Sequence, residues 1–419
     1  MVRERAGSQG NLTLTQPLVV LNAWSTCVEI TALSLGDLMK NILIFCDGTW
    51  NSASIELVTN VVKLRDAVVG TPGQAHLYIP GVGTGGRFAT ILGNVVNKVG
   101  GGAFGWGLNR NIKIAYSELA KSYNPGDKIM IFGFSRGAYT ARSLAGMIRK
   151  CGLPPKDKVT RQVVNKAFRL YRRRGPDNAP DKPNIWRQRR ELSPGYATSE
   201  KDRTDRNDGS HLLEIAYLGV WDTVGALGIP ANLLGPLAKH INSRHQFHDT
   251  DLTSLVKSAR HAVALDERRK FYVPALWDNL DTGTNGGLNK GATGPDRPFQ
   301  QMWFIGDHGV LGGRSSARGL VSYGMSWIVE GARDAGMTLK SGAAIPDAPP
   351  NPTDSAPEMN NPKGFYKLSP NLLAWRNGPR RQSDRHPSVD QRLDADPLYR
   401  PRSMAALRPE LWQGGTRIT

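Results

Sequence analysis

The chain has 419 residues, 39% of them hydrophobic and 21% charged, which is the composition of a globular protein with one large domain or two modest ones. Its 54 Lys and Arg against 36 Asp and Glu give a formal charge of +18, which indicates either an anionic partner (a membrane surface, a nucleic acid or an acidic protein) or a solvated basic surface. Three scattered cysteines exclude a disulfide framework, and no apolar run reaches the ~20 residues that a membrane-spanning helix needs.

Residues 1–38 are expected to form an N-terminal extension outside the fold. Their short apolar run, "PLVVLNAW", does not have the position or the small-residue ending of a signal peptide. A complete first strand begins at Met39 in "MKNILIFCDGTWN", so we expect the working protein to start there, with Met1 as the alternative. Synthesis is then cytoplasmic, in a reducing compartment, and any secretion would use a route that needs no signal peptide.

Short runs of β-branched and aromatic residues alternate with helical patterns along the chain. The runs predict strands at Asn41–Cys46, His76–Ile79, Lys128–Phe134, Ile215–Trp221 and Gln301–Ile305. The helical spacing predicts helices at Val58–Val69, Leu108–Lys121, Ala138–Arg149, Leu252–Asp266 and Gly319–Asp334. Continuous short apolar strands are typical of a parallel sheet that is buried on both faces. The alternation therefore predicts an α/β domain, with a mostly parallel sheet and flanking helices, over residues 39–340.

Two regions depart from this alternation. An Arg-rich insertion over about residues 156–210, with "LYRRRGPDNAPDKPNIWRQRRELSPGY" at its centre, is expected to be part helix and part exposed loop. From residue 341 the chain becomes rich in Pro, Asp, Asn and Arg, as in "GAAIPDAPPNPTDSAPEMNNP", which indicates a linker. Helical spacing returns in "SVDQRLDADPLYRPRSM", so we expect the tail 341–419 to dock on the core.

The motif that carries the chemistry is "KIMIFGFSRGAYTARSLAGMI", in which a strand, Gly-Phe-Ser-Arg-Gly and a helix follow one another. A nucleophilic serine needs this context, because a sharp strand-to-helix turn lifts its hydroxyl above the sheet. Gly133 and Gly137 would let the strand and the helix approach closely. The alternative is a structural turn in which Ser135 only caps the helix.

A serine nucleophile needs a base and an orienting carboxylate, which in α/β-hydrolases follow in the order Ser, acid, His. Asp222, directly after the predicted strand in "YLGVWD", is the best-placed acid, and His308 in "MWFIGDHGVLGG" is the best-placed base. Both follow strands, where catalytic groups gather. Asp307 would neighbour the site.

Other residues compete for these roles. His386, in "RHPSVDQR", is the main rival as the base, whereas His261 lies in a predicted helix and is more simply structural, although it could border the site. Asp47, in "FCDGTWN", is either the triad acid or a buried hydrogen-bonding support. Three histidines in a polar segment could hold a metal, but no carboxylate spacing supports that idea: His240, His245 and His248.

The tetrahedral intermediate of acyl transfer needs hydrogen-bond donors for its oxyanion. The N–H of Arg136, just after the serine, is the expected first donor, and the N–H of Gly48 or Thr49 is the expected second. The glycine-rich stretch after residue 80 lacks the Gly-Lys-Ser/Thr ending of a P-loop, so the sequence predicts no nucleotide cofactor and no metal.

Seven blocks occur together and in order: "ILIFCDGTWN", "PGVGTG", "GGAFGWGLNRNI", "FGFSRGAYTARSLAGMI", "GVWDTVGALG", "HAVALDERRKFYVPALW" and "WFIGDHGVLGG". The set resembles the uncharacterised α/β-hydrolase family that includes the catalytic domains of type VI secretion phospholipase effectors. The resemblance implies an α/β-hydrolase fold, a serine esterase mechanism with Ser135, Asp222 and His308 as the triad, and a lipid-like ester as substrate.

Two other function classes compete with this one. "ILIFCDGT" is similar to the opening motif of haloacid-dehalogenase phosphatases, but Phe45 occupies the position of their nucleophilic aspartate and cannot attack phosphorus. A non-enzymatic hydrolase-like scaffold with a basic surface is the remaining alternative, although no specific nucleic-acid signature supports it.

Overall fold

The computed structural model describes residues 39–48, 57–81, 102–225, 251–282, 285–356, 359 and 370–412, together with two short strands near the N-terminus. The strands of the main sheet are β1 (Leu18–Val20), β2 (Val28–Ile30), β3 (Asn41–Cys46), β4 (Gln74–Ile79), β5 (Lys128–Phe134), β8 (Ile215–Trp221), β9 (Val256–Ala264) and β10 (Phe299–Phe304). The helices are α1 (Asn60–Val68), α3 (Gly102–Ser122), α4 (Arg136–Cys151), α5 (Arg161–Tyr171), α6 (Pro183–Leu192), α7 (Glu200–Arg206), α9 (His308–Leu311), α10 (Arg318–Asp334) and α12 (Ser388–Ala395).

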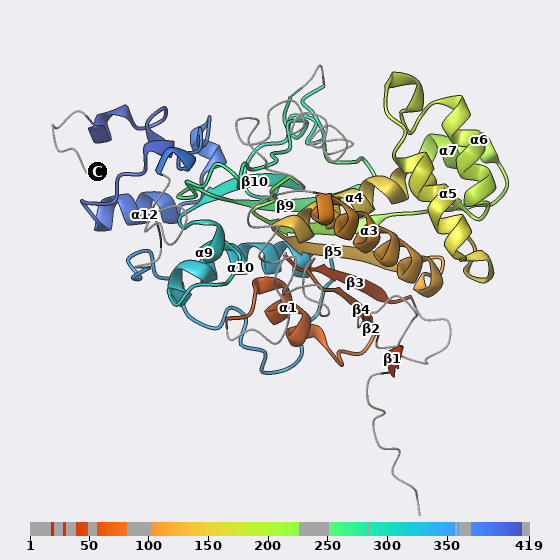
Figure 1. Cartoon of the computed structure of the whole chain (residues 1–419), viewed down its shortest axis with the longest axis horizontal. Coiled ribbons are helices and arrows are strands. Elements are labelled where there is room, and N and C mark those ends of the chain that lie inside the picture. Colours follow the sequence, from red (N-terminus) through yellow and green to blue (C-terminus); the bar gives the residue numbers. More distant parts are fainter. Residues whose placement is uncertain are drawn as a thin grey trace, which may run out of the picture.

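The eight strands form one sheet in the order β1-β2-β4-β3-β5-β8-β9-β10 (Figure 1). The six strands from β4 to β10 are parallel to one another, and only β1 and β2 at one edge are antiparallel. This arrangement confirms the predicted fold class, a mostly parallel sheet with flanking helices. The carboxyl ends of the parallel strands consequently lie at one edge of the sheet.

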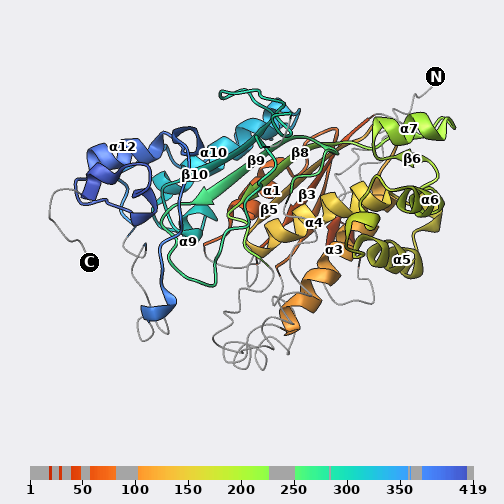
Figure 2. The same cartoon turned by 90° about the horizontal axis from the view of Figure 1, so that it is seen from above.

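Both faces of the sheet are buried, which explains the continuous apolar strands. Along β3, Ile42 and Ile44 pack with α3 and α4, whereas Leu43 and Phe45 pack with α1 and α10. Successive side chains of a strand point to opposite faces, so a strand between two helical layers must be apolar at every position. Figure 2 shows α10 on one side of the sheet and α3 and α4 on the other.

Strand β9 corrects the helix that we predicted at Leu252–Asp266. Its segment has apolar residues at helical spacing, but it lies between β8 and β10 in the interior of the sheet, with ladder partners on both sides. The residues from Arg260 to Ala264 are buried. Burial on two faces gives the strand no alternation of polar and apolar residues, so its pattern could not be told from that of a helix.

Near the N-terminus, β1 and β2 continue the sheet through the pairing of Ile30 with Leu77. The insertion forms α5, α6 and α7 with a small two-stranded sheet, β6 (Tyr196–Ala197) and β7 (His211–Leu212), at one end of the molecule. Residues 370–412, including α12, lie at the opposite end (Figures 1 and 2). None of the described helices is long and apolar enough to cross a bilayer.

Candidate active site

Ser135, Asp222 and His308 meet at the carboxyl edge of the sheet, where β5, β8 and β10 end. The Ser135 Oγ lies 2.8 Å from Nε2 of His308, and the His308 Nδ1 lies 2.5 Å from Oδ2 of Asp222. All three residues are buried. The sequence prediction had named these three side chains together, and the structure brings them into one hydrogen-bonded chain.

Ser135 occupies a tight turn between β5 and α4. Its φ of 59° is in the left-handed region, which costs a non-glycine residue on the order of 1–3 kcal/mol. The turn needs small residues on both sides: a Cβ on Gly133 would come within 2.7 Å of the Ala138 Cα, and one on Gly137 would overlap the carbonyl oxygen of Cys46. The two glycines therefore permit the close approach of helix and strand that the turn requires.

His308 is the first residue of the short helix α9. The carboxylate of Asp307 caps this helix by accepting from the Val310 N–H at 3.0 Å, so Asp307 supports the position of His308 without contacting its ring. The imidazole packs between the rings of Phe134 and Tyr272, with centroids 4.7 and 4.6 Å away. Burial lowers the pKa of His308 below its ordinary value, although Asp222 acts in the opposite direction, so the ring is neutral near pH 7.

Asp222 follows β8 and is itself held in a left-handed conformation, with φ of 37°. Its Oδ1 accepts from the Ala264 N–H at 2.9 Å, and the Arg376 guanidinium contacts both carboxylate oxygens. Burial alone would raise the pKa of Asp222, but the charge of Arg376 and the His308 hydrogen bond outweigh burial and hold the pKa well below its usual range. Asp222 is therefore ionised at neutral pH.

Asp47 has the features of a structural support. Its carboxylate accepts hydrogen bonds from the Gly48 N–H, the Thr59 hydroxyl and the Tyr78 hydroxyl at 2.7–2.9 Å. The Gly48 N–H, one of the two candidates for the second oxyanion donor, thus donates to the Asp47 carboxylate in this structure. Arg136 begins α4, next to the serine, and Thr49 lies outside the described residues.

The two rival histidines have other partners. His261 lies on β9, where its Nδ1 is 2.8 Å from the Gln301 side chain and its Nε2 accepts from the Thr223 N–H. His386 stacks on Phe304 at a centroid distance of 4.4 Å, and its Nδ1 contacts the Ser388 hydroxyl. Burial lowers the pKa of His261 to about 3 and that of His386 to about 4. Both act as neutral packing groups, and His308 is the histidine that reaches Ser135.

Comparison with known proteins identifies the family of the chain. A family model described as "T6SS, Phospholipase effector Tle1-like, catalytic domain" matches residues 40–331. The chain belongs to this family. The match confirms the resemblance noted in the sequence.

Three proteins are similar to parts of this Tle1-like chain. The uncharacterised Saccharomyces cerevisiae protein YEL023C is 30% identical over 261 residues, which cover 57% of this chain and 34% of that protein. The match to the crystal structure of an uncharacterised Pseudomonas aeruginosa protein covers 74% of this chain and 47% of that protein's chain, at 17% identity and a TM-score of 0.37. The match to the structure of the Tle1 effector bound to the VgrG spike of the type VI secretion system covers 70% of this chain and 54% of that chain, at 18% identity and a TM-score of 0.33. The chain thus spans about a third to a half of these relatives' length.

Four residues of the site were missed by sequence reasoning. Glu267, Arg269 and Tyr272 come from the segment after β9, just beyond the helix predicted at Leu252–Asp266, and Arg376 comes from the C-terminal tail. The Glu267 carboxylate accepts from the His308 N–H at 3.2 Å and pairs with Arg269 at 2.5 Å. Reading residues 256–264 as a strand would have placed Glu267 at the catalytic edge, whereas Arg376 carried no sequence signal.

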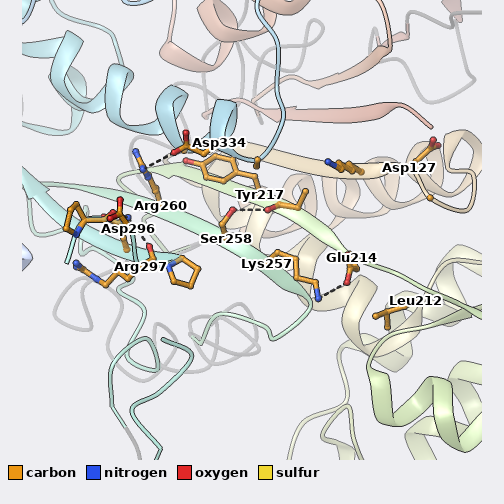
Figure 3. Close-up of a pocket in the computed structure, with 18 of the residues that line it drawn as sticks. Asp127, Leu212, Glu214, Tyr217, Lys257, Ser258, Arg260, Asp296, Arg297 and Asp334 are labelled. Atoms are coloured by element: carbon orange, nitrogen blue, oxygen red, sulfur yellow. Dashed lines mark hydrogen bonds and ion pairs between the residues drawn. The ribbon is translucent and has the colours of Figure 1, made fainter. Parts of the chain in front are cut away.

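The opposite, amino edge of the sheet has a cavity of about 590 Å³ (Figure 3). Four of its charged side chains form two ion pairs, Lys257 with Glu214 at 2.6 Å and Arg260 with Asp334 at 3.6 Å. The Ser258 hydroxyl donates to the Ala216 carbonyl at 2.9 Å. Among the described residues, no group of three or more His, Cys, Asp or Glu is placed to hold a metal; the three clustered histidines of residues 240–248 lie outside them.

Proposed function

We propose that this Tle1-like domain is a serine esterase that cleaves carboxylic esters of lipids, with Ser135 as the nucleophile, His308 as the general base and Asp222 as the orienting acid. The observation that carries the proposal is the unbroken hydrogen-bonded chain from the Ser135 Oγ through both nitrogens of His308 to the Asp222 carboxylate. The ionisation states suit the roles, because a neutral imidazole accepts a proton and an ionised carboxylate fixes the tautomer that can do so.

In the first half of the reaction, the Ser135 Oγ attacks the ester carbonyl carbon while His308 Nε2 takes the hydroxyl proton. The carbon–oxygen bond of the ester then breaks, and the leaving alcohol takes that proton from His308. In the second half, a water molecule loses a proton to His308 and attacks the acyl-enzyme, which releases the acid and regenerates Ser135. Asp222 accepts the Nδ1–H hydrogen bond throughout and stabilises the transient imidazolium.

The oxyanion of each tetrahedral intermediate needs at least one preorganised donor. The backbone N–H of Arg136, in the first turn of α4, has the position relative to Ser135 that this role requires. The second donor is assigned to the loop after β3, at Gly48 or Thr49. In the Gly48 case its N–H would have to exchange the Asp47 carboxylate for the oxyanion.

A lipid is the substrate class favoured by family membership and by charge. In the insertion 156–210, basic residues outnumber acidic ones by almost two to one. Five basic residues line a cavity of about 610 Å³ between α4 and the insertion, against two acidic ones: Arg142, Arg149, Lys150, Arg173 and Arg174, with Asp181 and Asp251. Arg142, Arg149 and Lys150 are buried, so Arg173 and Arg174 give this surface its exposed charge. Exposed charge of this sign attracts anionic head groups, each basic residue near a membrane contributing about 1 kcal/mol. This charge is also what a non-enzymatic scaffold would use.

A hydrolysis panel separates the enzyme from the scaffold. We would measure release of acid from p-nitrophenyl esters of increasing acyl length and from phosphatidylglycerol vesicles, for the wild type, S135A and H308Q. The control is S258A, the same substitution at a half-buried serine on the opposite, amino edge of the sheet. We expect S135A and H308Q to lose at least ~10³-fold in kcat and S258A to match the wild type. Equal hydrolysis by wild type and S135A, or none by any variant, would reject the proposal.

A further inference from the structure

Arg376 makes four hydrogen bonds to the Asp222 carboxylate and to backbone carbonyls beside it, although Arg376 lies outside residues 40–331, which the family model matches. Its Nη1 donates to Asp222 Oδ1 at 2.7 Å and to the Ala264 carbonyl at 2.8 Å. Its Nη2 donates to Asp222 Oδ2 at 3.0 Å and to the Tyr272 carbonyl at 2.5 Å. The Arg376 side chain is 6% exposed and that of Asp222 is fully buried, so water screens this ion pair very little.

Backbone pairing delivers this guanidinium to the site. The Ala374 N–H donates to the Arg268 carbonyl at 2.7 Å, and the Lys270 N–H donates to the Leu372 carbonyl at 2.9 Å. The C-terminal segment thereby forms an antiparallel bridge, Arg269 with Leu373, on the segment after β9. That segment also supplies Glu267 and Tyr272, so the position of Arg376 is fixed relative to the surroundings of His308.

Both oxygens of the Asp222 carboxylate are consequently occupied. Oδ1 accepts from Ala264 and Arg376, and Oδ2 accepts from Arg376 and His308, so the carboxylate cannot rotate without losing hydrogen bonds. An arginine fork suits this role because its donors match a carboxylate two by two. A lysine would supply the charge but not the planar pair of donors.

The charges around His308 are balanced in the same way. Asp222, from the end of β8, faces Arg376 of the C-terminal segment, and Glu267 faces Arg269 within the segment after β9. Asp307, next to His308 on its own element, is committed to capping α9. Tyr272 and Ser135 contribute a ring contact and a hydroxyl. Each of the two carboxylates that bond to His308 therefore has its own guanidinium, which limits how strongly an imidazolium is favoured before the substrate reacts.

We propose that Arg376 is a positioning residue: it locks the Asp222 carboxylate in place and, through its charge, sets the lower end of the pH range in which His308 acts as a base. This inference rests on the proposed triad. Both the guanidinium Nη2 and the imidazole Nδ1 touch Oδ2 of Asp222, so they are at most about 5.5 Å apart. Removing a cation at that separation favours the imidazolium and therefore raises the pKa of His308.

The test compares R376Q, which removes the charge, with R376K, which keeps it and loses the fork. The control is R380Q, an exposed arginine on the same segment. For each variant we would measure kcat and KM on a short-chain p-nitrophenyl ester from pH 5 to 9, and titrate the His308 ring by NMR, assigned with H308Q. We expect R376Q to move the acid limb of kcat/KM and the ring titration up by about one pH unit, with KM nearly unchanged.

R376K is expected to keep the acid limb within about 0.3 units while kcat falls about tenfold, and R380Q should match the wild type. A purely structural role would lower activity or the melting temperature equally at every pH, with no shift in R376Q, and that result would overturn the inference. If R376Q does not fold, the R376K variant provides the test. An R376K enzyme with the kcat of the wild type, or with its acid limb raised by a full pH unit, would overturn the inference. Absence of hydrolysis in the wild type would reject the proposed function instead, while the ring titration still tests the effect of Arg376.

Discussion

Replacing Asp222 by Asn should disable the site by reversing the tautomer of His308. In the wild type, Oδ1 accepts from the Ala264 N–H and Arg376 Nη1, whereas Oδ2 accepts from His308 Nδ1 and Arg376 Nη2. An asparagine would turn its single amide oxygen toward the two donors at the Oδ1 position. Its NH₂ would then face Nδ1 and donate to it. His308 would carry its proton on Nε2, where it cannot accept the proton of Ser135.

The magnitude follows from this geometry. Loss of the correct tautomer in a Ser-His-Asp site costs about 10⁴ in kcat, equivalent to about 5.5 kcal/mol of transition-state stabilisation. The same substitution leaves the Arg376 cation, 6% exposed, without its anion, which lowers the free energy of unfolding by about 3–5 kcal/mol. We therefore expect a large loss of rate together with a measurable loss of stability.

The assay is ester hydrolysis at a temperature well below the melting temperature of each variant, with unfolding followed by circular dichroism. D47N is the matched comparison, because Asp47 is equally buried but contacts Thr59 and Tyr78 rather than His308. It should lose less than about tenfold in kcat. A D222N enzyme within tenfold of the wild type, or a D47N enzyme that is the more impaired of the two, would refute the assignment of the acid.

Three further predictions follow from single features of the structure. G137A should lower the free energy of unfolding in urea by at least about 2 kcal/mol, because its Cβ would overlap the Cys46 carbonyl, whereas G195A, in open space, should change it by less than about 1 kcal/mol. Burial raises the pKa of Asp266 to about 6 in the folded state, so protonation of Asp266 stabilises the fold, and this stabilisation is lost as the pH rises from about 4 through 6. The melting temperature of D266N, measured relative to the wild type, should therefore increase between pH 4 and pH 8. A difference that stays constant with pH would contradict this prediction. The double variant R173Q/R174Q should weaken co-sedimentation with phosphatidylglycerol vesicles by about tenfold or more at low salt, and R380Q should not; equal losses would argue against the insertion as the membrane-facing surface.

Much of the fold could be predicted because each parallel strand is apolar on both faces and is followed by a turn and a helix. The strand Lys128–Phe134 has the predicted bounds, and the helix Arg136–Cys151 extends two residues beyond each end of the predicted Ala138–Arg149. The wrong prediction at β9 has a physical cause. The segment "VKSARHAVA" is a strand because it pairs with β8 and β10 inside the sheet, whereas its alanines and the spacing of its apolar residues suit a helix equally well.

The site was predictable where chemistry and topology coincide in one short motif. Ser135, Asp222 and His308 each follow a strand, so the rule that parallel strands present their carboxyl ends at one edge was enough to group them. Arg376 obeys no such rule, because it reaches Asp222 only through the pairing of the C-terminal segment with the segment after β9. Long-range pairing of irregular segments leaves no periodicity to read.

The most direct test of the account is to map the site of covalent reaction with a fluorophosphonate. We expect the wild type to be labelled once, on the peptide that contains Ser135, with labelling abolished in S135A and slowed at least ~10³-fold in H308Q. The label stands in for the acyl group on the serine oxygen, so its position reports the nucleophile. Labelling of another residue, or labelling that persists in S135A, would contradict the central claim.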